Sequence, residues 1–284
     1  MKKRHIWSAC AYAVCFLAAA CMCAPILILL SGSVMSRQEL AECLKPVLTA
    51  SNDTISWKLV PFYPTLEHFK KLLFTTPQFF VVFWNSVKLV LGILAGQLLI
   101  AVPAAWAFAV FRFRGRNTLF SLYVVLMLMP FQVTMLSQYL MLDRLNLLNT
   151  HAAIILPAVF STFPVFLIYR GFCALPSELL EAARIDGAGE WKIFRFIGLP
   201  LASTGIMSAM VLGFLEYWSL IEQPLAFLED KTLWPLSLYL PEIGLKQAGS
   251  SFAASVLTLV PPFFVFLLGQ EYLEQGIAAS AIKQ

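Results

Sequence analysis

Polar and aromatic side chains with chemical potential occur inside a segment that is otherwise apolar. Glu216, Ser219 and Gln223 follow one another at intervals of three and four residues, and Tyr217 and Trp218 lie beside them. That spacing places the first three on one face of a helix. A carboxylate that faces lipid costs roughly 2.5–3.5 kcal/mol on insertion scales, so we expect Glu216 to face a cavity or a partner chain. Carboxylates and amides bind hydroxyl groups, and aromatic rings pack on apolar ring faces, so this face predicts a path for a polar solute such as a sugar.

A similar polar face occurs earlier in the chain, where Thr134, Ser137 and Gln138 recur at helical spacing. The residues that we predict to line the substrate path are Glu216, Tyr217, Trp218, Ser219, Gln138 and Thr134. A different interpretation stays open for each of them. Polar groups of this kind often bridge helices, at about 0.6 kcal/mol per pair, and tryptophan and tyrosine often lie at membrane interfaces.

Residues for catalysis, metal binding or nucleotide binding do not converge in the sequence. The three histidines, His5, His68 and His151, are scattered, and we find no pair at metal-ligand spacing and no nucleophile beside a base. The phosphate-binding pattern G-x-x-x-x-G-K-[ST] is missing, and the chain holds no Gly-Lys pair. We therefore expect no catalytic residue, no metal site and no bound cofactor in this chain.

The composition is that of a membrane protein. Of 284 residues, 60% are hydrophobic and 13% are charged, whereas a soluble domain is about 45–50% apolar and about 25% charged. A membrane-spanning helix needs roughly 20 mostly apolar residues. Six runs qualify, at about 7–30, 85–111, 118–142, 152–173, 201–223 and 249–270. The prediction is an all-α membrane protein of one domain, residues 1–284, with six transmembrane helices. The first run also resembles a signal peptide, but its apolar length favours a retained span.

The positions of lysine and arginine predict the orientation, because short cytoplasmic loops carry an excess of both. With the N-terminus inside, the cytoplasmic side holds Lys2, Lys3, Arg4, Arg112, Arg114, Arg116, Arg170, Arg184, Lys192, Arg195 and Lys283. The short outer loops hold Arg144, Lys231 and Lys246. We therefore expect both termini in the cytoplasm. The net charge of +4 follows from this topology and from attraction to anionic lipid, with no need for nucleic acid.

The first outer loop, residues 31–80, contains a short amphipathic pattern. Thr65 is a suitable helix cap, and the apolar Leu66, Phe69, Leu72 and Leu73 recur at helical spacing. The pattern predicts a helix at the outer membrane interface, or one that contacts an external partner protein.

The loop from Glu178 to Pro200 is the most charged part of the chain, with seven charged residues among 23. Ser177 is a suitable cap for a short helix whose apolar face carries Leu179, Leu180 and Ala183, and we expect Gly187 and Gly189 to end it. A second helical pattern begins at Trp191. A loop that only connects two spans can be much shorter than this helix–turn–helix. We therefore expect the loop to dock into a groove on a partner protein.

The same loop resembles the EAA loop of binding-protein-dependent ABC importer permeases. That motif reads E-A-A, three residues, G, nine residues, I, any residue and L-P, and its fixed positions are Glu181, Ala182, Ala183, Gly187, Ile197, Leu199 and Pro200 here. The resemblance extends over about 200 residues and is similar to the carbohydrate subfamily that includes the maltose and glycerol-3-phosphate permeases. It includes FWNSVKLVL (83–91), PAAWAFAVFRFRGR (103–116) and the tail GIAASAIKQ (276–284).

This resemblance implies a fold, partners and coupling residues. The fold is that of a type I ABC importer permease, in which the loop at 174–200 inserts into a cytoplasmic ABC ATPase dimer that binds ATP and Mg²⁺. The implied coupling residues are Glu181, Ala182, Ala183, Asp186, Gly187, Ile197, Leu199 and Pro200. A second permease subunit completes a heterodimer, and a solute-binding protein delivers substrate from outside. The tail at 276–283 reaches toward the ATPase, and the location is the bacterial plasma (inner) membrane, multi-pass.

The resemblance thus implies one permease subunit of an ATP-driven importer for a sugar, oligosaccharide or sugar derivative. An importer of glycerol phosphate or another polar solute is the alternative, although arginines that would suit a phosphate are nearly missing from the spans. An ion-driven secondary transporter is a further alternative, which would transport without an ATPase.

Overall fold

The computed structural model describes the backbone of residues 2–48, 57, 59–239 and 247–281, and the side chains of 12–46, 57, 59–239 and 247–274. Every regular element among these residues is helical, which confirms the all-α class for that part of the chain. Lys246 and the last three residues of the predicted tail, which include Lys283, lie outside the described residues.

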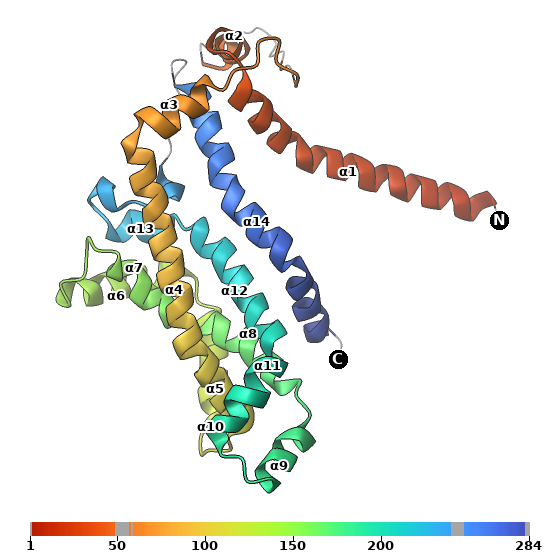
Figure 1. Cartoon of the computed structure of the whole chain (residues 1–284), viewed down its shortest axis with the longest axis vertical. Coiled ribbons are helices and arrows are strands. Elements are labelled where there is room, and N and C mark those ends of the chain that lie inside the picture. The colour runs from red at the N-terminus through yellow and green to blue at the C-terminus, as the bar shows by residue number, and fades with distance from the viewer. Residues whose placement is uncertain (1, 49–56, 58, 240–246, 282–284) are drawn as a thin grey trace. The chain divides into compact units, whose positions relative to one another are not determined.

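The chain divides into two compact units. Unit 1 comprises Met1–Phe80 and Leu240–Val260, and unit 2 comprises Val81–Tyr239 and Pro261–Gln284. The elements labelled in Figure 1 are α1 (Lys2–Val34), α2 (Arg37–Leu48), α3 (Glu67–Thr75), α4 (Pro77–Val110), α5 (Arg116–Met127), α6 (Phe131–Arg144), α7 (Ala152–Val159), α8 (Thr162–Cys173), α9 (Ser177–Ile185), α10 (Glu190–Ile193), α11 (Leu199–Leu201), α12 (Ser203–Trp218), α13 (Glu222–Phe227) and α14 (Ala248–Ala281). A π-helix, η1 (Phe194–Gly198), and two 3₁₀ turns, η2 (Lys231–Leu233) and η3 (Leu236–Leu238), complete the order.

Four helical segments are long and apolar enough to cross a membrane: Tyr12–Val34, Pro77–Val110, Ala152–Cys173 and Ala248–Glu274. Two bent pairs bring the number to six if each pair forms one span. The pairs are Arg116–Met127 with Phe131–Arg144, bent by 102°, and Glu190–Leu201 with Ser203–Trp218, bent by 67°. By length and composition, the described residues therefore hold four to six candidate spans.

Proline accounts for the sharper of these two bends. The sequence presents residues 118–142 as one apolar run, but α5 ends at Met127 and α6 begins at Phe131. Pro130 lies between them with extended backbone angles (φ −67°, ψ 150°). Its ring removes an N–H donor and disfavours the helical conformation at Met129, which favours the end of one helix and the start of another here.

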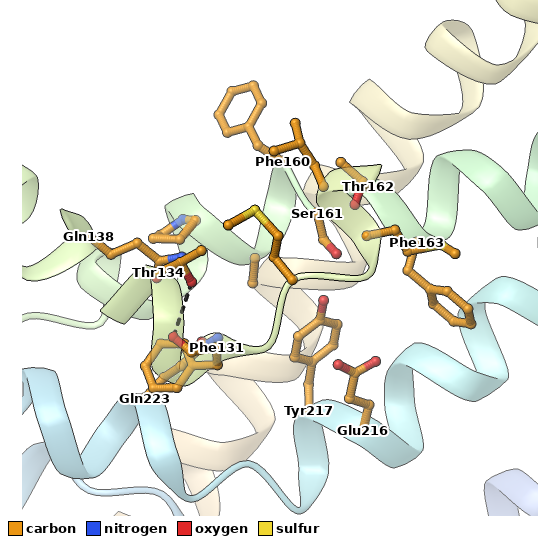
Figure 2. A pocket seen from close by; sticks show the side chains of 15 residues that line it. Phe131, Thr134, Gln138, Phe160, Ser161, Thr162, Phe163, Glu216, Tyr217 and Gln223 are labelled. Atoms are coloured by element: carbon orange, nitrogen blue, oxygen red, sulfur yellow. Dashed lines mark hydrogen bonds between the residues drawn. The ribbon is translucent and has the colours of Figure 1, made fainter. Parts of the chain in front are cut away.

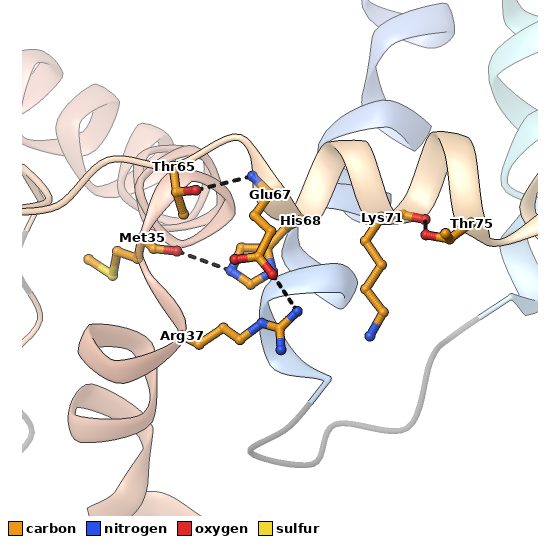
Figure 3. A network of polar contacts seen from close by, with 7 residues as sticks. All are labelled: Met35, Arg37, Thr65, Glu67, His68, Lys71 and Thr75. Carbon is orange, nitrogen blue, oxygen red and sulfur yellow. Dashed lines mark hydrogen bonds and ion pairs between the residues drawn. The ribbon is translucent and has the colours of Figure 1, made fainter.

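In unit 1, polar contacts attach α3 to the segment between α1 and α2 (Figure 3). Thr65 Oγ1 accepts a hydrogen bond from the Glu67 N–H at 3.2 Å, but the N-cap residue of α3 is Leu66, so the predicted cap lies one residue too early. His68, which the amphipathic pattern did not include, is only 3% exposed, and its Nε2 donates to the carbonyl oxygen of Met35 at 3.1 Å. Arg37 and Glu67 form an ion pair at 2.6 Å. The face of α3 that packs inward therefore centres on His68, while Leu66 is 60% exposed.

The buried imidazole predicts a stability that depends on pH. Burial lowers the pKa of His68 below its ordinary value, so the folded unit favours the neutral ring. Between the lowered pKa and about 6.5, the unfolded chain binds more protons, and the free energy of unfolding of unit 1 falls as the pH drops below about 6.5. Hydrogen exchange of the α3 amides, corrected for intrinsic rates, measures this loss between pH 7.5 and 5.

His68→Gln is the matched control, because its amide N–H can still donate to the Met35 carbonyl but does not titrate. We expect the extra loss of protection at low pH in the wild type alone. Equal pH dependence in both proteins would exclude His68 as its source.

In unit 2, α8 and α12 lie side by side (Figure 1). Their backbones approach closely, since a Cβ placed on Gly205 would lie 3.0 Å from the Cα of Gly171. A core of buried side chains continues from this crossing into the neighbouring helices. It includes Val102, Ala105, Trp106, Phe108, Val165, Ile168, Phe172, Leu180, Ala183, Ile193, Phe194, Ala202 and Ala209. The same core therefore holds α4, α8 and α12 together with the charged loop between α8 and α12.

Candidate functional site

The charged loop has a helix end whose geometry depends on Gly187. The Ala188 N–H donates to the carbonyl of Ala183 at 3.0 Å, and the Gly187 N–H donates to the carbonyl of Arg184 at 3.1 Å. These two bonds, with Gly187 at φ +81°, form a Schellman motif. The predicted helix stop at Gly187 is confirmed. Gly189 plays a different part from the one predicted, because it has an ordinary φ of −69° and caps the start of α10.

An ion pair joins the two sides of this turn. Arg184 Nε lies 2.8 Å from Glu190 Oε1, and Arg184 Nη2 lies 3.4 Å from Glu190 Oε2. Both side chains are exposed, so the pair adds about 0–1 kcal/mol to stability. It bridges α9 and α10 across the turn.

The loop presents an uneven surface in which apolar side chains reach solvent. Leu179 is 47% exposed, Ile185 is 86% exposed, and Trp191 and Phe196 are each 69% exposed. Of the predicted coupling residues, Ala183 is buried, Ile197 and Leu199 are half-buried, and the exposed ones are Glu181, Ala182, Asp186, Gly187 and Pro200. Leu180 and Ala183 do pack inward as expected, whereas Leu179 does not. Most of the motif is thus available to another molecule.

Trp106 anchors the second half of the loop, although no sequence pattern pointed to it. Its indole is 4% exposed and meets Phe172 and Phe194 at ring-centroid distances of 5.1 and 5.4 Å. A Cβ placed on Gly198 would lie 2.5 Å from Trp106 Cζ3. Gly198 is the position that the EAA pattern leaves free. The π-helix η1 therefore needs a glycine here to seat on the α4 tryptophan.

A polar pocket of about 560 Å³ lies elsewhere in unit 2 (Figure 2). It is lined by the end of α5, by α6, by the junction of α7 and α8, by α12 and by α13. Its lining residues are Leu126, Met127, Met129, Phe131, Thr134, Gln138, Pro157, Ala158, Phe160, Ser161, Thr162, Phe163, Glu216, Tyr217 and Gln223. Four residues of the predicted substrate path, from two separate segments of the sequence, therefore meet in one cavity: Thr134, Gln138, Glu216 and Tyr217.

Trp218 and Ser219 do not line this pocket. Trp218 is buried and stacks on Phe214, with ring centroids 5.5 Å apart and planes 11° apart. The Ser219 hydroxyl donates to the carbonyl of Leu215 at 2.8 Å. Because α12 ends at Trp218, the expected single helical face does not form, and Gln223 reaches the pocket from α13 instead.

Gln97 is a further residue that sequence reasoning missed. It is fully buried in α4, and its Nε2 donates to the carbonyl of Ala158 at 2.8 Å and to the Tyr217 hydroxyl at 2.9 Å. This amide fixes the Tyr217 ring at the pocket wall. A glutamine within the apolar run of α4 was the available signal.

No group of three or more His, Cys, Asp or Glu side chains that could hold a metal ion occurs among the residues that the structure describes.

Comparison with known proteins identifies similar sequences and a similar fold. A family model described as "Binding-protein-dependent transport system inner membrane component" matches residues 88–279. The arabinooligosaccharides transport system permease protein AraQ of Halalkalibacterium halodurans is 32% identical over 77% of this chain and 80% of its own length. The lactose transport system permease protein LacG of Rhizobium radiobacter is 32% identical over 70% of this chain and 74% of its own length. The sn-glycerol-3-phosphate transport system permease protein UgpE of Yersinia pestis is 32% identical over 69% of this chain and 72% of its own length.

Among solved structures, the chain resembles one of a bacterial ABC transporter involved in the import of the acidic polysaccharide alginate. The TM-score is 0.81, with 96% of this chain and 98% of that chain covered. At 19% identity, this likeness shows a common fold.

Proposed function

The chain belongs to the family of binding-protein-dependent transport system inner membrane components, and we propose that it is one permease subunit of an ATP-driven importer for a sugar, oligosaccharide or sugar derivative. The names of similar permeases support this substrate class, since two of them refer to arabinooligosaccharides and lactose. The pocket supports it too, because it combines hydroxyl, amide and carboxylate groups with aromatic rings.

The proposed subunit works with several partners. A cytoplasmic ABC ATPase dimer binds ATP and Mg²⁺, a second permease subunit completes the pathway, and an external solute-binding protein delivers the substrate. The sequence lacks a phosphate-binding loop, which is consistent with an energy source on another chain. In this proposal the chain crosses the bacterial inner membrane six times. The bent pair α5 and α6 forms the third span, residues 201–223 form the fifth, and both termini lie in the cytoplasm.

The observation that carries the proposal is the geometry of the loop at 174–200, which we take as the coupling element. Its Schellman turn is ordered, and it presents Ile185 and Trp191 to solvent beside Glu181. The loop also connects α8 and α12, which pack on each other. Movement of a docked ATPase would therefore reach both helices as one rigid step. The tail from residue 276 is proposed to extend toward the same ATPase.

Two other functions remain as alternatives with different predictions. An importer of glycerol phosphate or another polar solute has support in the similarity to UgpE. An ion-driven secondary transporter predicts uptake by the isolated chain in proteoliposomes under an ion gradient. Under the main proposal the isolated chain does not transport, and uptake requires the ATPase and ATP.

Glu181→Lys tests the coupling role directly. The variant reverses an exposed charge at the proposed contact, so we expect it to insert in the membrane normally but to lose the ATPase during affinity purification from native membranes. ATP-driven uptake should fall by about tenfold or more, which corresponds to the loss of one charge-assisted contact of about 1.4 kcal/mol or more.

Glu229→Lys is the matched control, because it makes the same change at an exposed position in the segment between α13 and η2. It should retain both the ATPase and the uptake. Full uptake by Glu181→Lys would exclude the loop from coupling.

A further inference from the structure

We propose that the pocket in Figure 2 selects an uncharged, polyhydroxylated ligand, a neutral glycan, over anionic sugars and phosphates. The inference rests on the proposed function and narrows its substrate class. Three independent features of the pocket support it: its charge, its hydrogen-bonding groups and its aromatic rings.

The charge of the pocket is balanced near zero. Its 15 lining residues include one carboxylate, Glu216, and no lysine, arginine or histidine. Two helices begin at its wall, α6 at Phe131 and α8 at Thr162. Each helix N-terminus carries roughly half a positive charge, so together they offset about one negative charge. A site for phosphate or carboxylate normally adds arginine or lysine, and none is present in this lining.

The hydrogen-bonding groups of the lining favour a ligand that donates. The Thr134 hydroxyl donates to the carbonyl of Phe131 at 3.1 Å, so its oxygen can accept from Gln138 Nε2 at 3.3 Å. This fixes the orientation of the Gln138 amide. Oε1 of Gln138 and Oε1 of Gln223 are both buried and accept no hydrogen bond from the described part of the chain.

Buried acceptors without a donor are costly. A small rotation of either amide toward the cavity would let a ligand O–H group donate to its oxygen and relieve this cost. Sugar hydroxyls both donate and accept. An ionised phosphate or carboxylate group only accepts, so that group cannot satisfy either amide oxygen. The lining also holds no lysine or arginine that would compensate for the loss of its water.

Aromatic side chains complete the site. Phe131, Phe160, Phe163 and Tyr217 line the pocket, and Phe160 is 63% exposed. Such rings suit the apolar faces of a pyranose or furanose. The volume of about 560 Å³ lies within the usual range of small-molecule sites, roughly 300–1,000 Å³.

The test uses two matched pairs of probes that differ in charge. They are methyl galactoside with methyl galacturonide, and glycerol with glycerol 3-phosphate. The full chain, co-purified with its partners from native membranes and placed in lipid nanodiscs without ATP, is examined by saturation-transfer NMR. We expect the neutral member of each pair to receive saturation and the anionic member to bind about tenfold more weakly or worse.

Three variants assign the effect to the pocket. Glu216→Gln removes the only carboxylate of the lining and leaves the two helix N-termini uncompensated, so the preference for neutral probes should shrink or reverse. Gln138→Leu removes an acceptor and should weaken the neutral probes. Glu222→Gln alters a carboxylate that accepts a hydrogen bond from Gln132 and does not line the pocket. It should change neither the preference for neutral probes nor the strength of their binding.

Equal binding of neutral and anionic probes to the wild type would overturn the inference. So would an unchanged preference in Glu216→Gln, or a lack of saturation transfer to any probe. The proposed function fails separately, if the chain co-purifies with no ATPase or if ATP does not drive uptake, because the probe measurement requires no hydrolysis.

Discussion

Gly198→Ala is expected to destabilise the protein by about 1–3 kcal/mol and to abolish ATP-driven uptake, although it adds a single methyl group. The new Cβ would lie 2.5 Å from Trp106 Cζ3. The indole cannot move aside easily, because it is buried between Phe172 and Phe194. Either the ring or η1 must shift, and a shift of η1 displaces the loop that we propose to be the coupling element.

Thermal unfolding of the purified chain in detergent measures the loss of stability, and co-purification of the ATPase measures the loss of coupling. Trp106→Phe provides the rescue, because a phenylalanine ring does not extend as far as the outer atoms of the indole. We expect the double variant Gly198→Ala with Trp106→Phe to be more stable than the sum of the two single effects predicts. Additive effects would mean that the methyl group and the indole do not collide.

Gly187→Pro should also have a large effect, of about 3 kcal/mol or more on the loop. Proline fixes φ near −65°, whereas Gly187 has φ +81°. Proline also removes the N–H that donates to the carbonyl of Arg184. The Schellman turn therefore cannot form, and we expect loss of ATPase co-purification while the spans stay inserted. Protease accessibility of the loop measures its unfolding, and affinity purification measures the loss of the partner.

Two matched variants test whether the effect comes from the positive φ of Gly187 or from the loss of any glycine in this loop. Gly187→Asn should retain most of the coupling, because asparagine tolerates the left-handed conformation better than other residues with a side chain. Gly189→Ala should be neutral, since its φ is ordinary and no atom lies within 4 Å of the added Cβ. If Gly189→Ala reduced ATPase co-purification as much as Gly187→Pro does, the positive φ of Gly187 would not explain the loss.

The loop could be predicted closely from the sequence because its signals are local. Glycine and helical periodicity act within a few residues, so α9, the turn at Gly187 and the resumption of helix near Trp191 all followed from spacing. The predicted cap was wrong, because Ser177 is the first residue of α9 and the N-cap is Pro176. The same is true of the helical class, because apolar runs of this length have few other solutions.

Features that depend on distant partners could not be predicted. Trp106 is one aromatic residue among many in an apolar run, and its importance comes from Gly198, 92 positions later in the chain. Pro130 signals a break, but the angle of 102° depends on what packs against both helices. The substrate-path residues were selected by helical spacing, and the pocket instead gathers them through the end of α12 and a second helix, α13.

The Schellman turn has a consequence for how a partner would hold this chain. Its backbone donors at Gly187 and Ala188 are already satisfied by α9, and the exposed Arg184–Glu190 pair bridges to α10. The turn is therefore preorganised before any partner binds. Association of a partner with this turn loses little conformational entropy, because few backbone and side-chain rotations become restricted on binding. A modest contact area is then sufficient for attachment. Because the turn is rigid, a displacement of α9 by a bound partner would also displace α10.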